Sequence, residues 1–275
     1  MGSPAPVVTP SPVPPPPAEF ARHVRRLRAR LPEGFHLVIE PPFVVLGDES
    51  PAMVERRAED TVRWAVNRLR RQYFEKRSPQ ILNIWLFRDR ESYEQHTWDL
   101  FRDKPTTPFG YYSPSERALV MNSATGGGTV VHEIVHPLLA ADFPQCPAWF
   151  NEGLASLYEQ SGERNERIHG YPNWRLPALQ EAIREKRLPP FRELCATSTQ
   201  EFYGQGSGLK YAQARYLCYY LQEEGLLEEY YAAFRDSAEK DPQGYETLRR
   251  VLGEPDMTLW ERRFHEFALG LEYRR

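Results

Sequence analysis

Two histidines and a glutamate at residues 132–136 could bind a metal and act on a water molecule beside it. His132 and His136 are four residues apart, so on an α-helix their imidazoles lie on one face, one turn apart, where both can reach the same Zn²⁺. Glu133 points about a quarter-turn away from His132, from where it can reach a metal-bound water instead of the metal. The stretch HEIVH therefore predicts two metal ligands and a general base.

A third ligand is expected downstream, in the segment WFNEGLA at residues 149–155. Its amphipathic spacing places Glu152 on a second helix, sixteen residues after His136. A catalytic zinc commonly takes three protein ligands, for example two His and one Glu, and leaves its fourth position to water. We therefore expect one Zn²⁺, bound by His132, His136 and Glu152.

Together, HEIVH and WFNEGLA resemble the gluzincin metallopeptidases, and among them the bacterial peptidase MA-like domain family, in which the glutamate after Asn supplies the third ligand. The resemblance covers about residues 36 to 225. It implies a zincin-like fold with the active-site cleft between an α/β lobe and a helical lobe. Other stretches similar to that family are ILNIWLF at 81–87, RLPALQ at 175–180 and YAQARYL at 211–217.

The activity implied is zinc-dependent hydrolysis of peptide bonds. Zinc lowers the pKa of its bound water from near 16 toward about 7 and polarises a neighbouring substrate carbonyl. Glu133 would take the proton of that water during attack on the amide carbon and deliver it to the leaving nitrogen.

A hydrogen-bond donor is also needed for the negative charge that develops on the carbonyl oxygen. Candidates in the helical half of the chain are Tyr211, Tyr203 and His169. We favour Tyr211, because it opens a helix after a Gly-rich loop and resembling family members place a tyrosine in the corresponding segment.

Two residues depart from the expected pattern. Pro137 directly follows His136, and because proline removes a backbone donor and clashes with the preceding turn, the zinc helix should kink or end there. Ser156 lies one turn beyond Glu152, where related gluzincins can carry an acidic residue that orients a ligand histidine. A hydroxyl can orient the ring too, with less electrostatic help.

Two alternatives stay open. Cys146 lies between the HEIVH helix and Glu152 and could complete a closed four-ligand structural zinc, although Pro147 and Trp149 after it are more typical of a helix start. The chain could also be a non-catalytic zinc-containing module that binds peptides or proteins, tethered by its Pro-rich N-terminus. Glu133 favours the enzyme, because a binding module has no use for a carboxylate aimed at the zinc water.

The elements that must position these residues follow from periodicity. Short β-rich runs at 36–40, 43–46, 81–87 and 118–122 alternate with helical segments at about 53–74 and 91–101. The later helices are expected at 147–160, 177–186, 207–223, 225–237, 242–252 and 257–270. We expect an α+β fold in which an α/β lobe with a small mixed sheet, residues 19–125, leads into a zinc-helix and helical lobe, residues 126–275, as one catalytic unit. Strand 118–122 should be a sheet edge that pairs with an extended peptide substrate.

Charge and composition exclude several classes of function. The net charge is −3, so no global basic field attracts nucleic acid or an anionic membrane. The basic run from Arg22 to Arg30 is interpreted as a solvated helix face. Three cysteines match no disulfide framework, and no apolar run is long enough to span a membrane.

The N-terminal segment 1–18 is a Pro-rich tail or linker whose composition favours extended polyproline II structure. As written the chain is expected to be soluble. Export, or tethering to the cell envelope through this tail, is a hypothesis that the sequence leaves open, together with oligomeric state, substrate and the choice between endo- and exopeptidase action.

Overall fold

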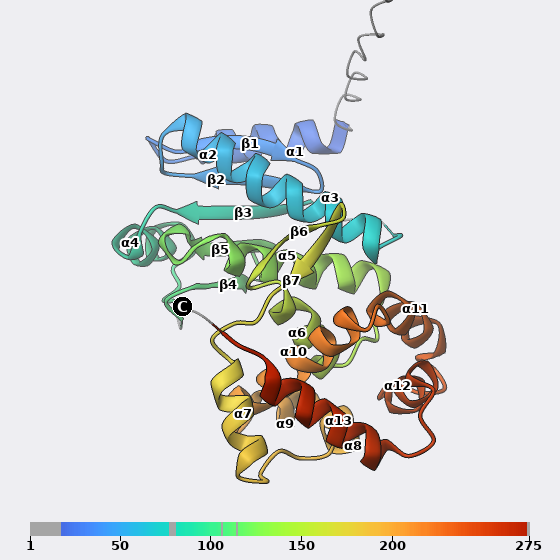
Figure 1. Cartoon of the computed structure of the whole chain (residues 1–275). Coiled ribbons are helices and arrows are strands. Elements are labelled where there is room, and N and C mark those ends of the chain that lie inside the picture. Colours follow the sequence, from blue (N-terminus) through green and yellow to red (C-terminus); the bar gives the residue numbers. More distant parts are fainter. Residues whose placement is uncertain (1–17, 77–80, 106, 114, 274–275) are drawn as a thin grey trace, which may run out of the picture.

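The computed structural model describes residues 18–76, 81–105, 107–113 and 115–273. Of the predicted tail at 1–18, residues 1–17 lie outside the described residues, and Ala18 is the first residue of helix α1 (Ala18–Arg28). The protein is α+β, as predicted. In Figure 1 a lobe with a five-stranded mixed sheet occupies the upper part and helices α7 to α13 lie below it, with α5 and α6 between them. The helices that carry the HEIVH and WFNEGLA motifs therefore lie where the two lobes meet.

The sheet has the strand order β1-β2-β3-β5-β4. β2 (Phe43–Gly47), β3 (Leu82–Phe87) and β5 (Ala118–Asn122) are parallel to one another and buried throughout, which explains their continuous apolar sequences. β1 (His36–Glu40) pairs antiparallel with β2 at one edge. The four strands predicted from the sequence are confirmed.

A fifth strand overturns one prediction. β4 (Gly110–Ser113) pairs antiparallel with β5, with Tyr111 opposite Val120, so segment 118–122 is an inner strand and the expectation that it forms the edge is wrong. β4 is short, and its sequence GYYS carries little alternation of apolar and polar residues, which is why periodicity alone did not reveal it.

Helices cover both faces of the sheet, because successive residues of a strand point to opposite sides. Val44 and Trp85 pack in a smaller core under α1 (Ala18–Arg28) and α4 (Arg90–Phe101). Val45 and Ile84 belong to the larger core, which is shared with the helical run α2 (Pro51–Arg57), η1 (Ala58–Arg63) and α3 (Trp64–Gln72) and with α5 (Gly127–Asp142).

The second lobe is helical where periodicity predicts it. Its helices are α6 (Ala148–Leu157), α7 (Leu176–Arg184), α8 (Phe191–Cys195), α9 (Thr199–Tyr203), α10 (Ser207–Glu223), α11 (Leu227–Ser237), α12 (Tyr245–Leu252) and α13 (Met257–Gly270). The short helices α8 and α9 were not predicted, and neither was a hairpin of β6 (Ser161–Arg164) and β7 (Arg167–Gly170). Its strands are mostly polar, and its two-residue turn, Asn165-Glu166, uses positive φ at both positions, as hairpin turns of this length do.

Pro137 does not end the HEIVH helix. α5 continues through it to Asp142, although the proline lacks the donor that would bond the carbonyl of Glu133. Leu138 and Leu139 after it are both buried in the larger core. Burial of these side chains offsets the lost backbone hydrogen bond, so tertiary packing outweighs the local preference.

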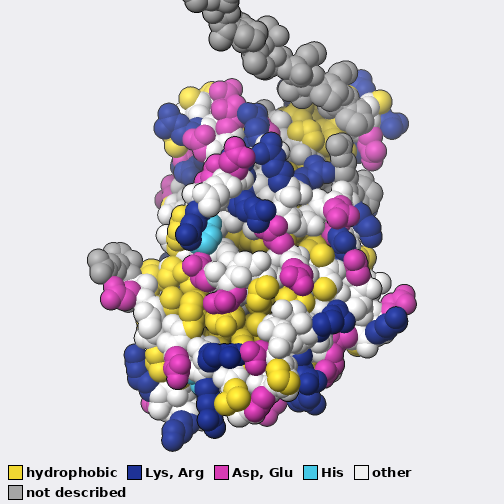
Figure 2. Space-filling model, turned by 45° about the vertical axis from the view of Figure 1, so that its right-hand side comes forward, with side chains coloured by type: hydrophobic (Ala, Val, Ile, Leu, Met, Phe, Trp, Pro, Cys, Tyr) yellow, Lys and Arg dark blue, Asp and Glu magenta, His cyan; other side chains and the backbone are white. Residues whose placement is uncertain are grey.

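The surface carries charges of both signs. On the face shown in Figure 2, Lys and Arg side chains are interspersed with Asp and Glu, and no single-sign field dominates it. In the part of the chain that the structure describes, no helix combines the length and the apolar character needed to cross a bilayer.

Candidate metal centre

Helices α5 and α6 pack against each other and carry all three predicted ligands. Two glycines permit the close approach of these helices to their neighbours. A Cβ at Gly128 would overlap the carbonyl oxygen of Glu159, and a Cβ at Gly153 would lie 2.9 Å from the carbonyl oxygen of Ala214 on α10. Gly153 directly follows Glu152, so the contact between α6 and α10 fixes the helix beside the third ligand.

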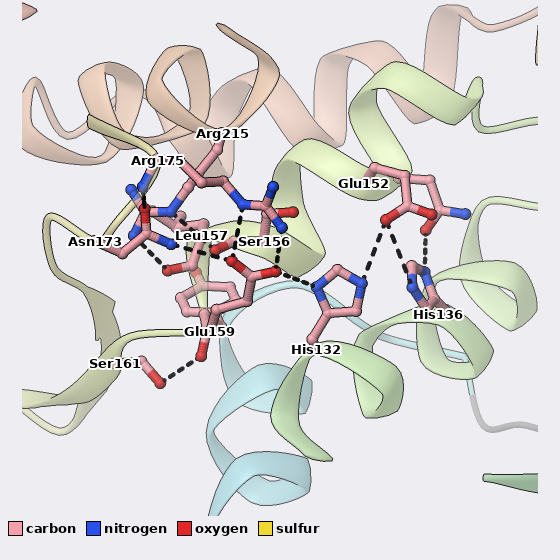
Figure 3. Close-up of polar contacts among 12 residues, drawn as sticks. His132, His136, Glu152, Ser156, Leu157, Glu159, Ser161, Asn173, Arg175 and Arg215 are labelled. Carbon is pink, nitrogen blue, oxygen red and sulfur yellow. Dashed lines mark hydrogen bonds and ion pairs between the residues drawn. The ribbon is translucent and has the colours of Figure 1, made fainter. Parts of the chain in front are cut away.

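The three predicted ligands converge on one point (Figure 3). Their ligand atoms all lie within 4.8 Å of one another. Glu152 Oε2 is 3.3 Å from Nε2 of His132 and 3.9 Å from Nε2 of His136. The two rings are edge to face, with centroids 4.9 Å apart, as expected for residues one helical turn apart.

One oxygen of Glu152 lacks a hydrogen-bond donor. Oε1 accepts a hydrogen bond of 2.6 Å from Tyr203, but Oε2 is buried and, among the described residues, no donor is aligned with it. A buried carboxylate oxygen that has lost its hydration and has only ion-pair contacts, with no aligned hydrogen bond, is unfavourable. A divalent cation between Oε2 and the two Nε2 atoms would satisfy it, and this set of nitrogen and oxygen donors suits zinc. The residues present therefore fit the predicted group.

Each ligand histidine has an acceptor near its other nitrogen. Nδ1 of His136 is 2.8 Å from Oδ1 of Asn151, and Nδ1 of His132 is 3.4 Å from Oε1 of Glu159, an ion-pair distance without the alignment of a hydrogen bond. With the proton on Nδ1, the lone pair of Nε2 points toward Glu152, which is the tautomer that a metal ligand needs.

Glu159 was not singled out from the sequence. Ser156, the residue expected to support a ligand histidine, is fully buried, and its hydroxyl has no hydrogen-bond partner within the described residues. Glu159 lies two helical turns beyond Glu152, just past the end of α6, and reaches His132 instead. The spacing of seven residues from the third ligand, which returns to the same helix face, is the pattern that could have revealed it.

The charges of the centre are strongly coupled. Burial lowers the pKa of His132, but the carboxylates of Glu152 and Glu159 outweigh burial and raise it to about 10. Burial raises the pKa of Glu152, but His132, His136 and Tyr203 together lower it to about 2. Without a metal, His132 therefore carries a proton at neutral pH, held between two ionised carboxylates.

Glu133 and Tyr203 are close enough for their charges to interact. Glu133 is half-buried, and in the described part of the chain no hydrogen bond or ion pair holds its carboxylate. After burial and the influence of Glu152, the charge of Glu133 contributes to raising the pKa of the Tyr203 hydroxyl. The phenol of Tyr203 therefore contacts the predicted ligand Glu152, and the Glu133 carboxylate follows the predicted ligand His132 in sequence.

The other two donor candidates are placed differently. Tyr211 lies beside Tyr203, with ring centroids 6.4 Å apart, and its ring packs under the guanidinium of Arg175 at 5.0 Å. His169 lies on β7, where its Nε2 is 3.1 Å from Oε1 of Glu223. It lines a separate pocket that none of the three ligands borders. The structure therefore brings both tyrosines, but not His169, to the centre.

Cys146 does not join the ligand group. The group of described residues that could hold a metal is His132, His136 and Glu152. The Cys146 thiol lies 3.7 Å from the carbonyl oxygen of Pro147. Three protein ligands leave a coordination position for water, as in catalytic rather than closed structural sites.

No protein-family model matches this chain, and no curated protein matches it. The chemistry of the centre is therefore the main guide to what the protein does. Two imidazoles and a carboxylate that converge on one point, with a second carboxylate alongside, can hold a divalent cation next to a general base.

Proposed function

We propose that this protein is a zinc-dependent metallopeptidase of the gluzincin type, which hydrolyses peptide bonds. The observation that carries the proposal is the buried Oε2 of Glu152, which makes no aligned hydrogen bond and lies 3.3 Å and 3.9 Å from Nε2 of His132 and His136. A Zn²⁺ ion held there would supply a Lewis acid that polarises a substrate carbonyl and makes a neighbouring water more acidic.

Glu133 is the general base in this proposal. Its carboxylate is adjacent to the ligand His132 in sequence and is not engaged by another described side chain. It would accept the proton of the attacking water and return that proton to the leaving amine nitrogen. A site that only bound a metal for structural reasons would not need a free carboxylate at this position.

Tyr203 is better suited than Tyr211 to donate to the developing oxyanion. Its hydroxyl already reaches the ligand Glu152 at 2.6 Å, while 48% of the residue is exposed, so it can exchange this bond for one to a substrate. Tyr211 is held between Arg175 and the ring of Phe202. Its role in the proposal is to pack against Tyr203.

The free edge of β4 is a suitable place for an extended peptide. β4 contacts α5 and lies at an edge of the described sheet. The Thr107 hydroxyl bonds both the N–H and the carbonyl oxygen of Gly110, so an added strand would pair beyond Gly110 or displace Thr107. An added peptide strand would form main-chain hydrogen bonds there and run past the zinc helix. The sequence predicted that segment 118–122 would pair with a peptide substrate. In this proposal β4 pairs with the substrate instead, because β4 lies at the edge of the sheet.

Zinc analysis and a peptide-cleavage assay test the proposal together. Purified protein is expected to hold one zinc per chain and to cleave quenched peptides from a broad library, with activity lost to a chelator and restored by Zn²⁺. Glu133→Gln should keep the zinc and lose about 10²- to 10⁴-fold in kcat. The control is Glu55→Gln, which removes an exposed carboxylate on α2 and should leave activity unchanged.

Two results would contradict the proposal in different ways. Protein that binds no zinc would reject the metal centre itself. Protein that binds one zinc but cleaves no member of the library would support the non-catalytic peptide-binding module. Cleavage that persists in Glu133→Gln, or with chelator present, would point to a contaminating protease.

A further inference from the structure

Glu159 links the ligand His132 to the helical lobe. In Figure 3 its carboxylate lies between His132 on one side and Arg175 and Asn173 on the other. Oε2 accepts hydrogen bonds from Nδ2 of Asn173 at 3.0 Å and from Nε of Arg175 at 3.1 Å. Oε1 is 2.8 Å from Nη2 of Arg175 and 3.4 Å from Nδ1 of His132. Both oxygens are thus fixed, and Oε1 is the one presented to the imidazole.

The segment that holds Glu159 is itself anchored to α10. Asn173 is fully buried, and its backbone N–H donates to the hydroxyl of Tyr216 at 3.0 Å. The buried guanidinium of Arg215 donates to the carbonyl oxygens of Tyr171 and, at 3.0 Å, Ser156. α10 therefore holds both the end of α6 and the loop that carries Asn173 and Arg175.

Arg175 holds the Glu159 carboxylate in a bidentate, largely buried contact, unlike an exposed surface ion pair. Its guanidinium contacts both oxygens of Glu159 through two different nitrogens, which is the bidentate arrangement that fixes a carboxylate most strongly. The side chain is 22% exposed and the Glu159 side chain 9%, so water screens the pair only weakly.

We propose that Arg175 is a positioning residue of the metal centre, which acts through Glu159 to hold the His132 imidazole with Nε2 directed at Glu152. The inference rests on the proposed metal site. It gives Glu159 and Arg175 the orienting role that Ser156, one turn beyond Glu152, does not perform. Partners of this kind typically change metal affinity by about 10- to 100-fold when they are removed.

Zinc affinity, measured by competition with a chromogenic chelator, tests the proposal without any peptidase assay. Arg175→Met and Glu159→Gln are each expected to weaken zinc binding by about 10- to 100-fold. Arg175→Lys keeps the charge but not the bidentate contact, and should fall between wild type and Arg175→Met. The visible spectrum of the Co²⁺-substituted protein should change in Arg175→Met and Glu159→Gln, because the position of one imidazole is altered.

Arg68→Met is the matched control. Arg68 is 21% exposed and also makes two contacts to one carboxylate, with both Glu163 oxygens at 2.9 Å. The pair lies on α3 and β6 and touches no ligand histidine. Because Glu163 is 41% exposed, this variant should lose less stability than Arg175→Met, and it should keep wild-type zinc affinity and the wild-type Co²⁺ spectrum.

The outcomes separate this inference from the proposed function. Wild-type protein that binds no zinc overturns the proposed function and the inference with it. If wild-type protein binds zinc and the zinc affinity of Glu159→Gln is within twofold of the wild-type affinity, the positioning role is overturned and the proposed function stands. Thermal unfolding of the metal-free proteins checks that each variant folds. Arg175 also packs on Tyr211, so Arg175→Met can fail to fold for that reason. In that case the zinc affinity of the isosteric Glu159→Gln decides whether the positioning role holds.

Discussion

At the scale of single residues, Tyr203 and Tyr211 should differ sharply in kinetics. Tyr203→Phe removes the hydroxyl that bonds Glu152, and if that hydroxyl donates to the oxyanion, kcat should fall by about 10²- to 10³-fold while KM changes little. Tyr211→Phe should lower kcat by less than about tenfold. Steady-state kinetics on one peptide with both variants decides between them, and the reverse order would restore Tyr211 as the donor.

Zinc binding should tighten as pH rises. Although burial lowers it, the pKa of His132 is raised to about 10 by Glu152 and Glu159, so in the metal-free protein this ring is protonated below that pH. Zn²⁺ must displace that proton, and apparent affinity should therefore rise by about tenfold per pH unit between about pH 6 and 9. Chelator competition at several pH values measures the slope, and a flat profile would show that His132 binds no metal.

At the scale of elements, the packing of α6 on α10 depends on Gly153. Gly153→Ala places a methyl group 2.9 Å from the carbonyl oxygen of Ala214, so the two helices must move apart, at a cost of about 1–3 kcal/mol in the free energy of unfolding. Gly208→Ala is the control: its Cβ meets no atom within 4 Å in α10, and helix propensity should make it neutral or slightly stabilising. Urea unfolding compares the two, and equal stabilities would refute the close-packing argument.

Asp142 connects the end of α5 to α11 and to the segment that follows α3. It accepts hydrogen bonds from the backbone of Lys76 at 2.9 Å, from Tyr231 at 2.7 Å and from Arg235 at 3.0 Å. Asp142→Asn should reduce the free energy of unfolding at pH 7 by about 3 kcal/mol, because it leaves the Arg235 charge without this partner. Asp236→Asn removes an exposed carboxylate at the same 3.0 Å from Arg235 and should change stability by less than about 0.5 kcal/mol.

The lowered pKa of Asp142 determines how the free energy of unfolding changes at acid pH. Burial raises the pKa of Asp142, but its hydrogen bonds outweigh burial and hold the pKa below its ordinary value. An unfolded aspartate titrates near about pH 3.9, so this stabilisation is present above that pH and is lost as pH falls through the lower folded pKa. The difference in stability between wild type and Asp142→Asn should therefore shrink below about pH 4, and a difference that grows there would contradict the assignment.

Sequence alone predicted what is local. The HEIVH spacing is a property of one helix turn, and the apolar strands and amphipathic helices are properties of short windows, so these elements and the convergence of His132, His136 and Glu152 could be anticipated. Pro137 shows the limit, because burial of the following leucines keeps α5 intact where local rules predict a break.

What could not be predicted depends on contacts between distant segments. The edge position of β4 follows from strand order, which short polar strands do not encode in their periodicity. Glu159 supports His132 only because Asn173 and Arg175 hold it, and those residues are more than a dozen positions further along the chain. The orienting partner was expected at Ser156 because local helix spacing cannot reveal such a contact.

At the scale of the whole molecule, the proposed zinc would join the two lobes. α5 packs in the core beneath the sheet, whereas α6 packs along α10 in the helical lobe, so the ligands come from both sides of the junction. Zinc at 100 times its Kd should add about 2.7 kcal/mol to the stability of the folded state, which corresponds to a rise in Tm of roughly 5–10 °C for a chain of this size. Calorimetry with Zn²⁺ and with chelator measures the shift, and Glu152→Gln, which removes one ligand charge, should abolish most of it. A wild-type Tm that is the same in both conditions, with one zinc bound per chain, would show that the ion binds the unfolded chain as tightly as the assembled site, which contradicts a centre that exists only when the two helices are packed together.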